Sequence, residues 1–285
     1  MITSIKAYAK INICLNVLDK LENGYHNVDL ITIPLALHDI VELERLPKGY
    51  ETFITSDDIS IPTNESNLSC IAFKKLKEKY NFEDNFLIHI YKRIPMSAGL
   101  AGGSSNAAAV INVLRKKLKL PINEQELIDL GLSIGADVPF CIFNKPARCQ
   151  GLGEKLTFIN LKKKYYVLLI KPNQGISTAE AYKAFDDLEI KPNLCNVDKV
   201  IEALENGDDD LLAKEINNNL LPCAVEMVPE ISSIIQKLKD DGFPLTMMSG
   251  SGSTVFALST NYRLLSKELD LFDDDNHTVI LTSTL

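Results

Sequence analysis

The sequence lacks several features that would assign it to a membrane, secreted or metal-binding class. It contains no run of about 18 apolar residues, so no segment is expected to span a membrane. Its N-terminus has no uninterrupted apolar stretch like that of a signal peptide, and the expected compartment is cytoplasmic. The 6 cysteines form no Cys-x-x-Cys pair and have no histidine at zinc-ligand spacing, which indicates reduced, structural thiols.

An excess of positive charge is also missing. The 38 acidic residues outnumber the 30 lysines and arginines, giving a formal net charge of −8 at pH 7. Nucleic acids and anionic membranes are held by concentrated lysine and arginine, so neither is an expected partner. Apolar residues make up 46% and charged residues 24% of the chain, as in ordinary globular proteins. The length of 285 residues predicts two domains.

The N-terminal segment predicts a strand with two different faces. From Ile5 to Val17 the apolar residues occupy the odd positions, which is the period-2 pattern of a half-buried strand. The even positions are mostly polar and include Lys10 and Asn12, so a binding surface is expected on that face. On local grounds alone, Lys10 is interpreted as a solvated lysine.

Strands and helices are expected to mix along the rest of the chain without strict alternation, which favours an α+β fold. The expected strands are 30–36, 40–46, 86–94, 165–170, 245–248, 254–258 and 278–281, and the expected helices include 67–80, 178–185, 197–204, 211–220 and 229–238. Another helix opens at Asn123 with a capping box to Glu126 and is expected to end near Gly135. The domain boundary is placed between residues 1–158 and 159–285.

A glycine- and serine-rich segment, PMSAGLAGGSSNAAA from Pro95 to Ala109, joins a strand to a helix. Glycines let the backbone approach a phosphate closely, and a helix N-terminus attracts anions. Ser104 or Ser105 is expected to cap the helix. The Walker and dinucleotide-binding patterns are both absent from this segment. A phosphate-binding loop and a glycine-rich connection without a ligand both fit it.

A second loop of small residues, MSGSGST at 248–254, lies between two strand-like runs. Taken alone it fits a hairpin turn. Its free N–H groups also suit a second contact with phosphate. Two such loops in one chain favour a shared function.

Asp137 follows a helix end and precedes Val138 and Pro139. A proline is expected to hold the preceding residue in an extended conformation, which would place Asp137 in a rigid corner. An aspartate in this position fits a turn or a cap, and it also fits a catalytic carboxylate.

Tyr25 and His26 follow the turn signal Asn23-Gly24, so both are expected on a loop. The tyrosine could stack on a planar base, and the histidine could form hydrogen bonds at its edge. An exposed turn without a ligand also fits this pair.

Five segments together resemble the kinase superfamily of galactokinase, homoserine kinase, mevalonate kinase and phosphomevalonate kinase, the GHMP kinases. They are Ala9-Lys-Ile-Asn-Ile13, Asn23-Gly-Tyr-His26, Gly99 to Ala109, Gly135-Ala-Asp-Val-Pro-Phe140 and Ser249-Gly-Ser-Gly-Ser253. Within this superfamily the chain closely resembles, over essentially its whole length, the kinases of 4-diphosphocytidyl-2-C-methyl-D-erythritol. The resemblance implies an N-terminal domain like the second domain of ribosomal protein S5 and a ferredoxin-like C-terminal domain.

The resemblance also implies a reaction and its residues. ATP, with Mg²⁺, would phosphorylate the 2-hydroxyl of the cytidyl substrate in the non-mevalonate isoprenoid pathway. Asp137 would orient and deprotonate this hydroxyl, and Lys10 would stabilise the charges beside it. Tyr25 and Tyr182 would sandwich the cytosine ring while His26 reads its edge.

The remaining implied contacts divide between the substrate and ATP. Asn12 and Thr178 would contact the methylerythritol diphosphate portion. The residues implied for ATP are Pro95, Gly99, Leu100, Ala101, Gly102, Gly103, Ser104, Ser105 and Asn106, with support from Gly250, Ser251 and Gly252 and with Ser105 as a candidate metal contact.

Some positions depart from the family pattern. Ala101 stands where a glycine is usual, so a positive φ is not expected there. Asn23 replaces the usual aspartate, and Asn144-Lys-Pro146 replaces a segment in which small glycines are common.

Other functions remain compatible with these motifs. One is another kinase of the superfamily, such as a homoserine kinase, although Tyr25 and His26 favour a cytidyl substrate. A second is a nucleotide-binding protein without turnover, against which Lys10 and Asp137 argue. A third is a decarboxylase of the same superfamily. The chain is expected to be a monomer or a weak homodimer that acts on small molecules.

Overall fold

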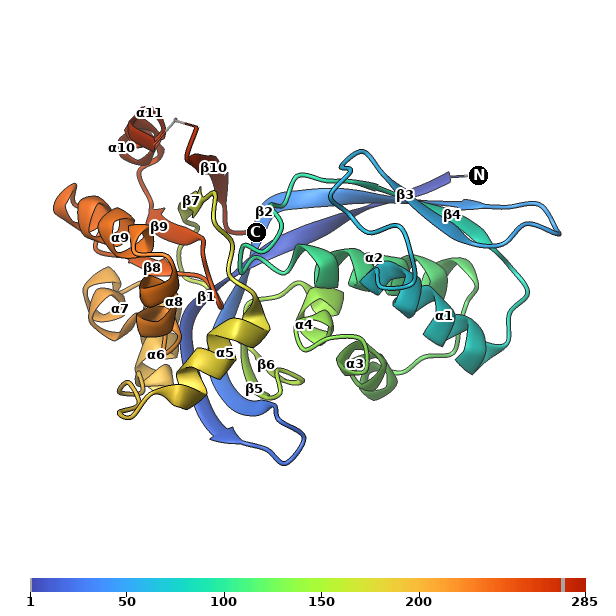
Figure 1. The fold of residues 1–285 in the computed structure, drawn as a ribbon, viewed down its shortest axis with the longest axis horizontal. Coiled ribbons are helices and arrows are strands. Elements are labelled where there is room, and N and C mark those ends of the chain that lie inside the picture. Colours follow the sequence, from blue (N-terminus) through green and yellow to red (C-terminus); the bar gives the residue numbers. More distant parts are fainter. Residues whose placement is uncertain (1, 273–274) are drawn as a thin grey trace. The chain divides into compact units, whose positions relative to one another are not determined.

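The computed structural model describes residues 2–272 and 275–285 and forms two compact units. Unit 1 comprises Met1–Ala9, Leu37–Ile94 and Ala101–Asn144, and unit 2 comprises Lys10–Ala36, Pro95–Leu100 and Lys145–Leu285. Two long strands, β1 (Ile2–Lys20) and β2 (His26–Arg45), contribute residues to both units (Figure 1). The domains expected at 1–158 and 159–285 follow a different division and stay a prediction.

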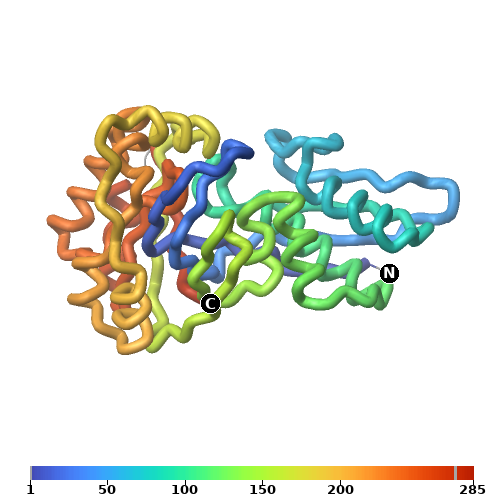
Figure 2. The backbone as a smooth tube through the Cα atoms, turned by 90° about the horizontal axis from the view of Figure 1, so that it is seen from below, coloured from blue at the N-terminus to red at the C-terminus, as the bar shows by residue number. Residues whose placement is uncertain are grey.

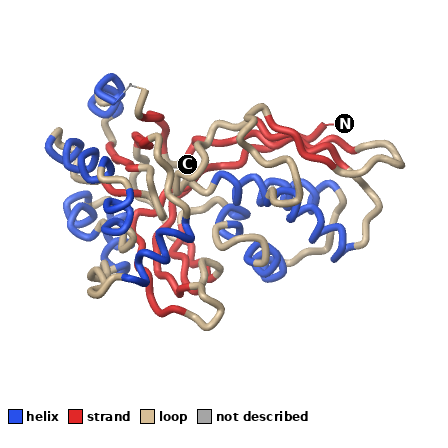
Figure 3. Tube along the Cα trace, viewed as in Figure 1, coloured by secondary structure: helices blue, strands red, loops and turns tan. Residues whose placement is uncertain are grey.

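Unit 1 is an α+β structure with its helices gathered on one side of its strands (Figure 3). β3 (Phe53–Ser56) pairs in parallel with β4 (Phe86–Tyr91), and β4 pairs antiparallel with the second half of β2. The helices are α1 (Leu68–Tyr80), α2 (Gly102–Lys117), α3 (Glu124–Leu132) and α4 (Val138–Phe143). α1 lies beside α2 (Figure 2), and α4 contacts both α2 and α3.

Local sequence signals explain where two of these helices begin. The side chain of Asn67 accepts a hydrogen bond from Ser69 N at 2.8 Å and caps α1. α3 begins with the expected capping box, in which Asn123 and Glu126 exchange side chain to backbone hydrogen bonds. The expected end near Gly135 is late, because the last helical residue is Leu132.

Unit 2 contains a four-stranded antiparallel sheet with the order β10-β7-β9-β8. The strands of this sheet are β7 (Tyr166–Pro172), β8 (Thr246–Met248), β9 (Val255–Ser259) and β10 (His277–Ser283). The other strands that follow β2 in this unit are β5 (Ala147–Gly151) and β6 (Lys155–Phe158). The helices are α5 (Thr178–Asp187), α6 (Val197–Asn206), α7 (Asp209–Glu215), α8 (Leu221–Met227), α9 (Glu230–Asp240), α10 (Tyr262–Lys267) and α11 (Leu269–Phe272). β5 pairs with the first half of β2 and with β6.

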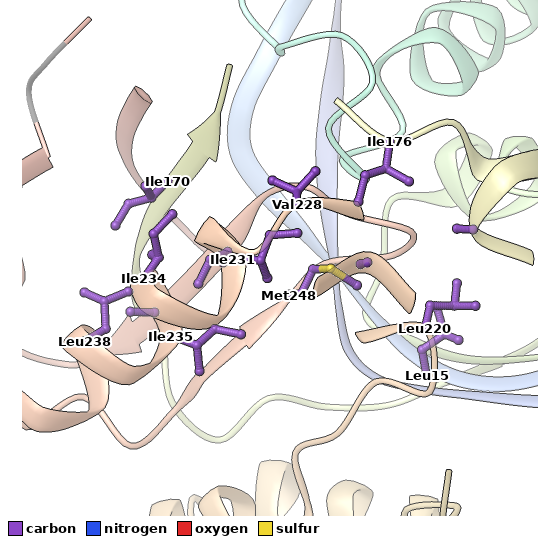
Figure 4. Close-up of a cluster of buried hydrophobic side chains, with 14 of the residues drawn as sticks. Leu15, Ile170, Ile176, Leu220, Val228, Ile231, Ile234, Ile235, Leu238 and Met248 are labelled. Atoms are coloured by element: carbon purple, nitrogen blue, oxygen red, sulfur yellow. The ribbon is translucent and has the colours of Figure 1, made fainter. Parts of the chain in front are cut away.

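The hydrophobic core of unit 2 lies between this sheet and its helices (Figure 4). α9 contributes Ile231, Ile234, Ile235 and Leu238, whose spacing of three and four residues places them on one face of the helix. Met248 at the end of β8 packs into the same cluster. The loop after β8 is therefore held at one end by buried apolar side chains.

One expected helix is shorter than its sequence pattern indicates. A helix over 211–220 was expected, but α7 ends at Glu215. The asparagines that follow bind distant backbone instead: Asn217 and Asn219 both donate to the carbonyl of Asn193. Asparagine side chains compete in this way with helical hydrogen bonds, which explains the early end. The strands expected at 30–36 and 40–46 are parts of one continuous strand, β2, which ends at Arg45.

No disulfide joins any of the 6 cysteines, all of which lie in the described part of the chain. Among the described helices, none combines the length and the apolar character that crossing a membrane requires.

Glu268 predicts a pH dependence of stability. Burial raises the pKa of Glu268, and the carboxylate of Asp241 raises it further. Because the pKa of Glu268 in the folded protein exceeds the ordinary value of 4.5, the folded protein binds this proton more tightly than the unfolded chain does. The contribution of Glu268 to the free energy of unfolding is therefore full below pH 4.5 and is lost as the pH rises through the raised pKa. We expect Glu268→Gln to remove this decrease in the free energy of unfolding, measured by urea unfolding from pH 4.5 upward through the raised pKa. Glu226→Gln should keep the decrease. Identical slopes for the wild type and Glu268→Gln would contradict the assignment.

Candidate active site

The N-terminus of α2 has the features of an anion site. The helix begins at Gly102, no side chain caps it, and its first turn contains no acidic residue. The first N–H groups of a helix have no partner within the helix and carry a partial positive charge. This end of α2 is therefore suited to a phosphate.

Two expectations about this loop are wrong. Ala101 has a φ of 58° and a ψ of 29°, so it adopts the left-handed conformation that was not expected for an alanine. This conformation turns the chain into α2, and the strain on an alanine has to be offset by contacts elsewhere. Neither Ser104 nor Ser105 caps the helix, because both lie inside its first turn.

The two serines of the loop have different surroundings in unit 1. Ser105 is 2% exposed, and its hydroxyl donates to the carbonyl of Tyr8 at 2.6 Å. Its oxygen keeps a lone pair for a further contact. Ser104 Oγ lies 3.9 Å from the position that a Cβ on Gly135 would occupy. The first turn of α2 is thus next to the segment that leads to Asp137.

A buried ionic network supports the start of α2. One carboxylate oxygen of Asp39 accepts from the backbone N–H groups of Arg93 and Ile94, at 2.7 and 2.8 Å. The other oxygen accepts from Lys92 Nζ at 2.5 Å and from Asn106 Nδ2 at 2.8 Å. Asp39 is fully buried, and sequence analysis did not single it out because its partners are distant along the chain.

Asp137 directly precedes α4 and is partly exposed. Its side chain makes no capping hydrogen bond to α4, so the interpretation as a helix cap is wrong. The expectation that Pro139 holds Val138 extended is also wrong, because Val138 is the first residue of α4. Proline fits the first turn of a helix, where its missing N–H is not needed.

In unit 2 the two glycine-rich loops touch each other. Ser249 Oγ donates to the carbonyl of Gly99 at 3.0 Å. A Cβ on Gly250 would lie 3.3 Å from Gly99 Cα, and a Cβ on Gly252 would lie 2.7 Å from Met248 Sδ. The contact explains why small residues occur at the same point in both loops.

Gly99 is expected to tolerate no side chain. Its φ is +68°, and a Cβ there would lie only 2.1 Å from the carbonyl oxygen of Ser249. Positive φ and overpacking each destabilise by about 1–2 kcal/mol, so Gly99→Ala should lose at least about 2 kcal/mol in urea unfolding. The matched control is Gly242→Ala, since Gly242 has a φ of +92° and nothing within 4 Å of a Cβ. Equal losses in the two variants would contradict the steric argument.

The polar face of β1 is buried from Lys10 to Asn16, whereas Lys6 is exposed. Lys10 is 3% exposed, so its interpretation as a solvated lysine is wrong. Its Nζ donates to Asn12 Oδ1 at 2.7 Å. Asn12 Nδ2 donates to Thr32 Oγ1 at 2.9 Å, and the backbone N–H of Asn12 donates to Ser249 Oγ at 3.2 Å. Asn12 thereby joins Lys10 to the second glycine loop.

Asn218 supports the same loop and was not singled out from the sequence. It is 2% exposed and donates from Nδ2 to the carbonyls of Met248 and Gly250, at 2.9 and 2.8 Å. Its Oδ1 accepts from Leu220 N at 2.9 Å. The run of three asparagines at 217–219 was the available signal, because asparagine favours such local backbone contacts.

The start of α5 also reaches this region of unit 2. Thr178 Oγ1 lies 3.1 Å from Ser251 Oγ, within hydrogen-bond distance. A Cβ on Gly175 would lie 2.9 Å from Ser97 Cβ, so the segment before α5 runs close to residues 95–100. Unit 2 therefore brings together residues from five separate segments, which are β1, 95–100, 175–178, 217–219 and 248–254.

His26 and Tyr182 lie together, while Tyr25 is 62% exposed. His26 begins β2 and is buried, which corrects its expected loop position. Its ring centroid lies 5.3 Å from that of Tyr182, and its Nε2 lies 2.7 Å from Asp186 Oδ1. Burial opposes ionisation of Asp186, but hydrogen bonds from Lys20 and His26 outweigh it and lower the pKa of Asp186.

Among the described residues, no group of three or more His, Cys, Asp and Glu side chains is arranged to hold a metal ion. Mg²⁺ bound together with a nucleotide usually takes only one or two protein ligands and keeps several waters. The oxygens of Ser105 and Asp137 are of the hard type that Mg²⁺ prefers.

Comparison with known proteins identifies the class to which this fold and site belong. The family model for the N-terminal domain of GHMP kinases matches residues 67–145. The model for the C-terminal domain of GHMP kinases matches residues 200–268. The first match includes the glycine loop, α2 and Asp137, and the second includes Asn218 and residues 249–253.

Full-length relatives refine this assignment. The chain is 38% identical to the 4-diphosphocytidyl-2-C-methyl-D-erythritol kinase of Clostridium botulinum strain Eklund 17B, a match that covers 99% of this chain and 100% of the relative. It is also 38% identical to the enzyme of that name from Caldicellulosiruptor saccharolyticus, over 98% of this chain and 96% of that one. The chain belongs to the 4-diphosphocytidyl-2-C-methyl-D-erythritol kinase family of GHMP kinases.

Solved structures agree with this assignment. A crystal structure of 4-(cytidine 5'-diphospho)-2C-methyl-D-erythritol kinase matches with a TM-score of 0.79 and 26% identity, covering 99% of this chain and 98% of that one. A homoserine kinase from Cytophaga hutchinsonii matches with a TM-score of 0.75 but only 20% identity, over 99% and 94% of the two chains, which shows a shared fold. The α+β fold is thus that of the GHMP kinases, and the chain is an ATP-dependent kinase.

Proposed function

We propose that this kinase transfers the γ-phosphoryl group of ATP to the 2-hydroxyl of 4-diphosphocytidyl-2-C-methyl-D-erythritol, a step of the non-mevalonate isoprenoid pathway. The observation that carries the proposal is the full-length identity of 38% to enzymes of that name. The substrate residues proposed from the sequence are all present in unit 2: Asn12, Tyr25, His26, Thr178 and Tyr182.

The uncapped start of α2 supports a role in holding the triphosphate. Its N–H groups are not engaged by a capping side chain, and Gly102 and Gly103 leave the backbone accessible. Mg²⁺ would enter with the triphosphate and neutralise its charge, with Ser105 as the candidate protein contact. Phosphoryl transfer requires mainly positioning and charge stabilisation, which a rigid helix terminus supplies.

Asp137 is the proposed base for the substrate hydroxyl, and Lys10 is the proposed cation that stabilises the alkoxide as it forms. Two structural facts support these roles. The side chain of Asp137 does not cap α4. Lys10 is held by Asn12 in a buried position, where the low dielectric constant strengthens electrostatic interactions.

The surroundings of His26 support recognition of cytosine. An ionised Asp186 accepts a hydrogen bond, so Nε2 of His26 must be the donor in this contact. In a neutral imidazole the other nitrogen, Nδ1, is then an acceptor. The exocyclic amino group of cytosine is a donor and suits that acceptor. Tyr182, beside His26, offers an aromatic face for the base.

An assay of ADP release tests the substrate assignment. The purified protein is incubated with ATP, Mg²⁺ and one of three acceptors: the cytidyl substrate, homoserine or mevalonate. We expect ADP to be released with the cytidyl substrate alone. Release with homoserine or mevalonate in its place would overturn the substrate assignment, and carbon dioxide release from a diphosphomevalonate substrate would indicate a decarboxylase.

A further inference from the structure

Asp186 lies in the last turn of α5, and its two carboxylate oxygens have different partners in unit 2. Oδ1 lies 2.7 Å from Nε2 of His26 at the start of β2. Oδ2 accepts a hydrogen bond from Nζ of Lys20, the last residue of β1, at 2.5 Å. The side chain of His26 is only 4% exposed, whereas that of Lys20 is 54% exposed. The carboxylate therefore joins a buried imidazole to a lysine at the surface.

The groups around this contact are held in place. Lys191 Nζ donates to the backbone carbonyls of Phe185 and Asp186, which fixes the end of α5. The ring of Phe185 meets that of His26 edge to face, with centroids 6.2 Å apart and an interplanar angle of 89°. The ring of Tyr182 lies beside the same imidazole. Because packing fixes the position of the imidazole, its partner at Nε2 decides which ring nitrogen carries the proton.

The charge of Asp186 sets the hydrogen-bonding character of His26. An ionised carboxylate can only accept hydrogen bonds, so Nε2 of His26 is the donor in the contact of 2.7 Å. The second nitrogen of a neutral imidazole, Nδ1, is then an acceptor. No residue in the described part of the chain forms a hydrogen bond with Nδ1 of His26. Nδ1 is therefore the acceptor that His26 can offer to a ligand.

Cytosine and uracil differ at the group that such an acceptor would contact. Cytosine carries an exocyclic amino group, which is a donor, whereas uracil has a carbonyl oxygen there, as thymine does. An acceptor at Nδ1 would attract the amino group and repel the carbonyl oxygen. A protonated Nδ1 would have the opposite preference. Two buried acceptors that face each other without a proton between them weaken binding by about tenfold or more.

We propose that Asp186 is the positioning residue that makes this kinase select cytosine over uracil, because it holds His26 in the tautomer with the proton on Nε2. This role rests on the proposed function, in which His26 reads the edge of the base. Lys20 contributes by occupying Oδ2, which leaves Oδ1 to face the imidazole. Asp186 thus acts on the base through His26.

The variant Asp186→Asn separates this role from a merely structural one. Lys20 has only donors, so it would bind the amide oxygen and leave the NH₂ group facing His26. Nε2 would then be the acceptor, Nδ1 would carry the proton, and the preference would change from cytosine to uracil. In the double variant Lys20→Met with Asp186→Asn the amide can turn over and offer its oxygen to Nε2. This second change should restore the preference for cytosine.

Nitrogen-15 NMR of the imidazole nitrogens tests the tautomer itself and needs no substrate. Spectra are recorded at pH 8, where an imidazole is ordinarily neutral. The chain has 4 histidines, and the signals of His26 are identified by their loss in His26→Gln. We expect the proton on Nε2 in the wild type and in the matched control Asp187→Asn, which changes the next, exposed residue, and on Nδ1 in Asp186→Asn. A proton on Nδ1 in the wild type, or on Nε2 in Asp186→Asn, would overturn the proposal.

Selectivity is measured with the cytidyl substrate and its uridine analogue, by calorimetry and by ADP release. We expect the wild type and Asp187→Asn to favour the cytidyl compound by at least about tenfold, through KM more than through kcat. Asp186→Asn should lose or reverse this preference. Equal affinity of the wild type for both compounds, or an unchanged preference in Asp186→Asn, would refute the role of Asp186. Absence of ADP release by the wild type with either compound would instead count against the proposed function and leave the NMR result standing.

Discussion

Replacing Asp137 by alanine is expected to lower kcat about a thousandfold while ATP affinity stays within a few-fold of the wild type. A positioned general base contributes about 10²–10⁴-fold to the rate, and its loss acts on the proton transfer and not on nucleotide binding. The nucleotide is assigned instead to the uncapped start of α2. The measurements are ADP release with saturating substrates and ATP affinity from calorimetry.

A matched variant separates this effect from a general disturbance of unit 1. Asp129 is an aspartate of α3 that accepts a hydrogen bond from Gln125 at 2.9 Å, and Asp129→Asn should keep nearly full turnover. The isosteric variant Asp137→Asn should be as inactive as Asp137→Ala, but its midpoint of urea unfolding should equal that of the wild type. A kcat for Asp137→Ala close to that of the wild type would remove Asp137 from the mechanism.

The Asp39→Asn variant is expected to lose about 3–5 kcal/mol of unfolding free energy, because it breaks a buried ion pair and leaves one charge without a partner. The side chain of Lys92 is only 6% exposed and that of Asp39 is fully buried. An asparagine at position 39 would turn an amide NH₂ toward either the donors Lys92 and Asn106 or the backbone N–H groups. Urea unfolding measures the loss.

Two comparisons make the role of Asp39 testable. Asp57→Asn removes an exposed partner of Arg93 and should change stability by no more than about 1 kcal/mol. The double variant Asp39→Asn with Lys92→Met removes the unpaired charge and should recover part of the loss. The network also reaches the start of α2 through Asn106, so Asp39→Asn should weaken ATP binding. A loss as small as that of Asp57→Asn would contradict this account.

Some features of the fold were predictable because their causes lie within a few residues. Asn67 and Asn123 mark the starts of α1 and α3 through hydrogen bonds to the next turn. The odd positions of β1 from Ala7 to Val17 are buried as its period-2 pattern predicted, although the even positions from Lys10 to Asn16 are buried as well. The loop after Met248 is the predicted connection between two paired strands. The glycine segment leads into α2 as expected.

Other features of the candidate site were not predictable because their causes are distant in the chain. Ala101 adopts a positive φ that its own side chain disfavours, so the surrounding structure imposes it. Asp39 meets Asn106 across 67 positions, and nothing near Asp39 in the sequence marks it as an ion-pair partner. The same holds for Asp186, which reaches His26 across 160 positions.

Local patterns along the chain were sufficient to indicate the class of enzyme and many of the helices and strands, while the site residues that they indicate stay predictions. The burial of Lys10 and the contacts of Ser249 with both Asn12 and Gly99 depend instead on the folded chain as a whole. Patterns within one turn or one strand encode local hydrogen bonds and the buried face. Contacts between residues up to 237 positions apart in the sequence form only when the chain folds.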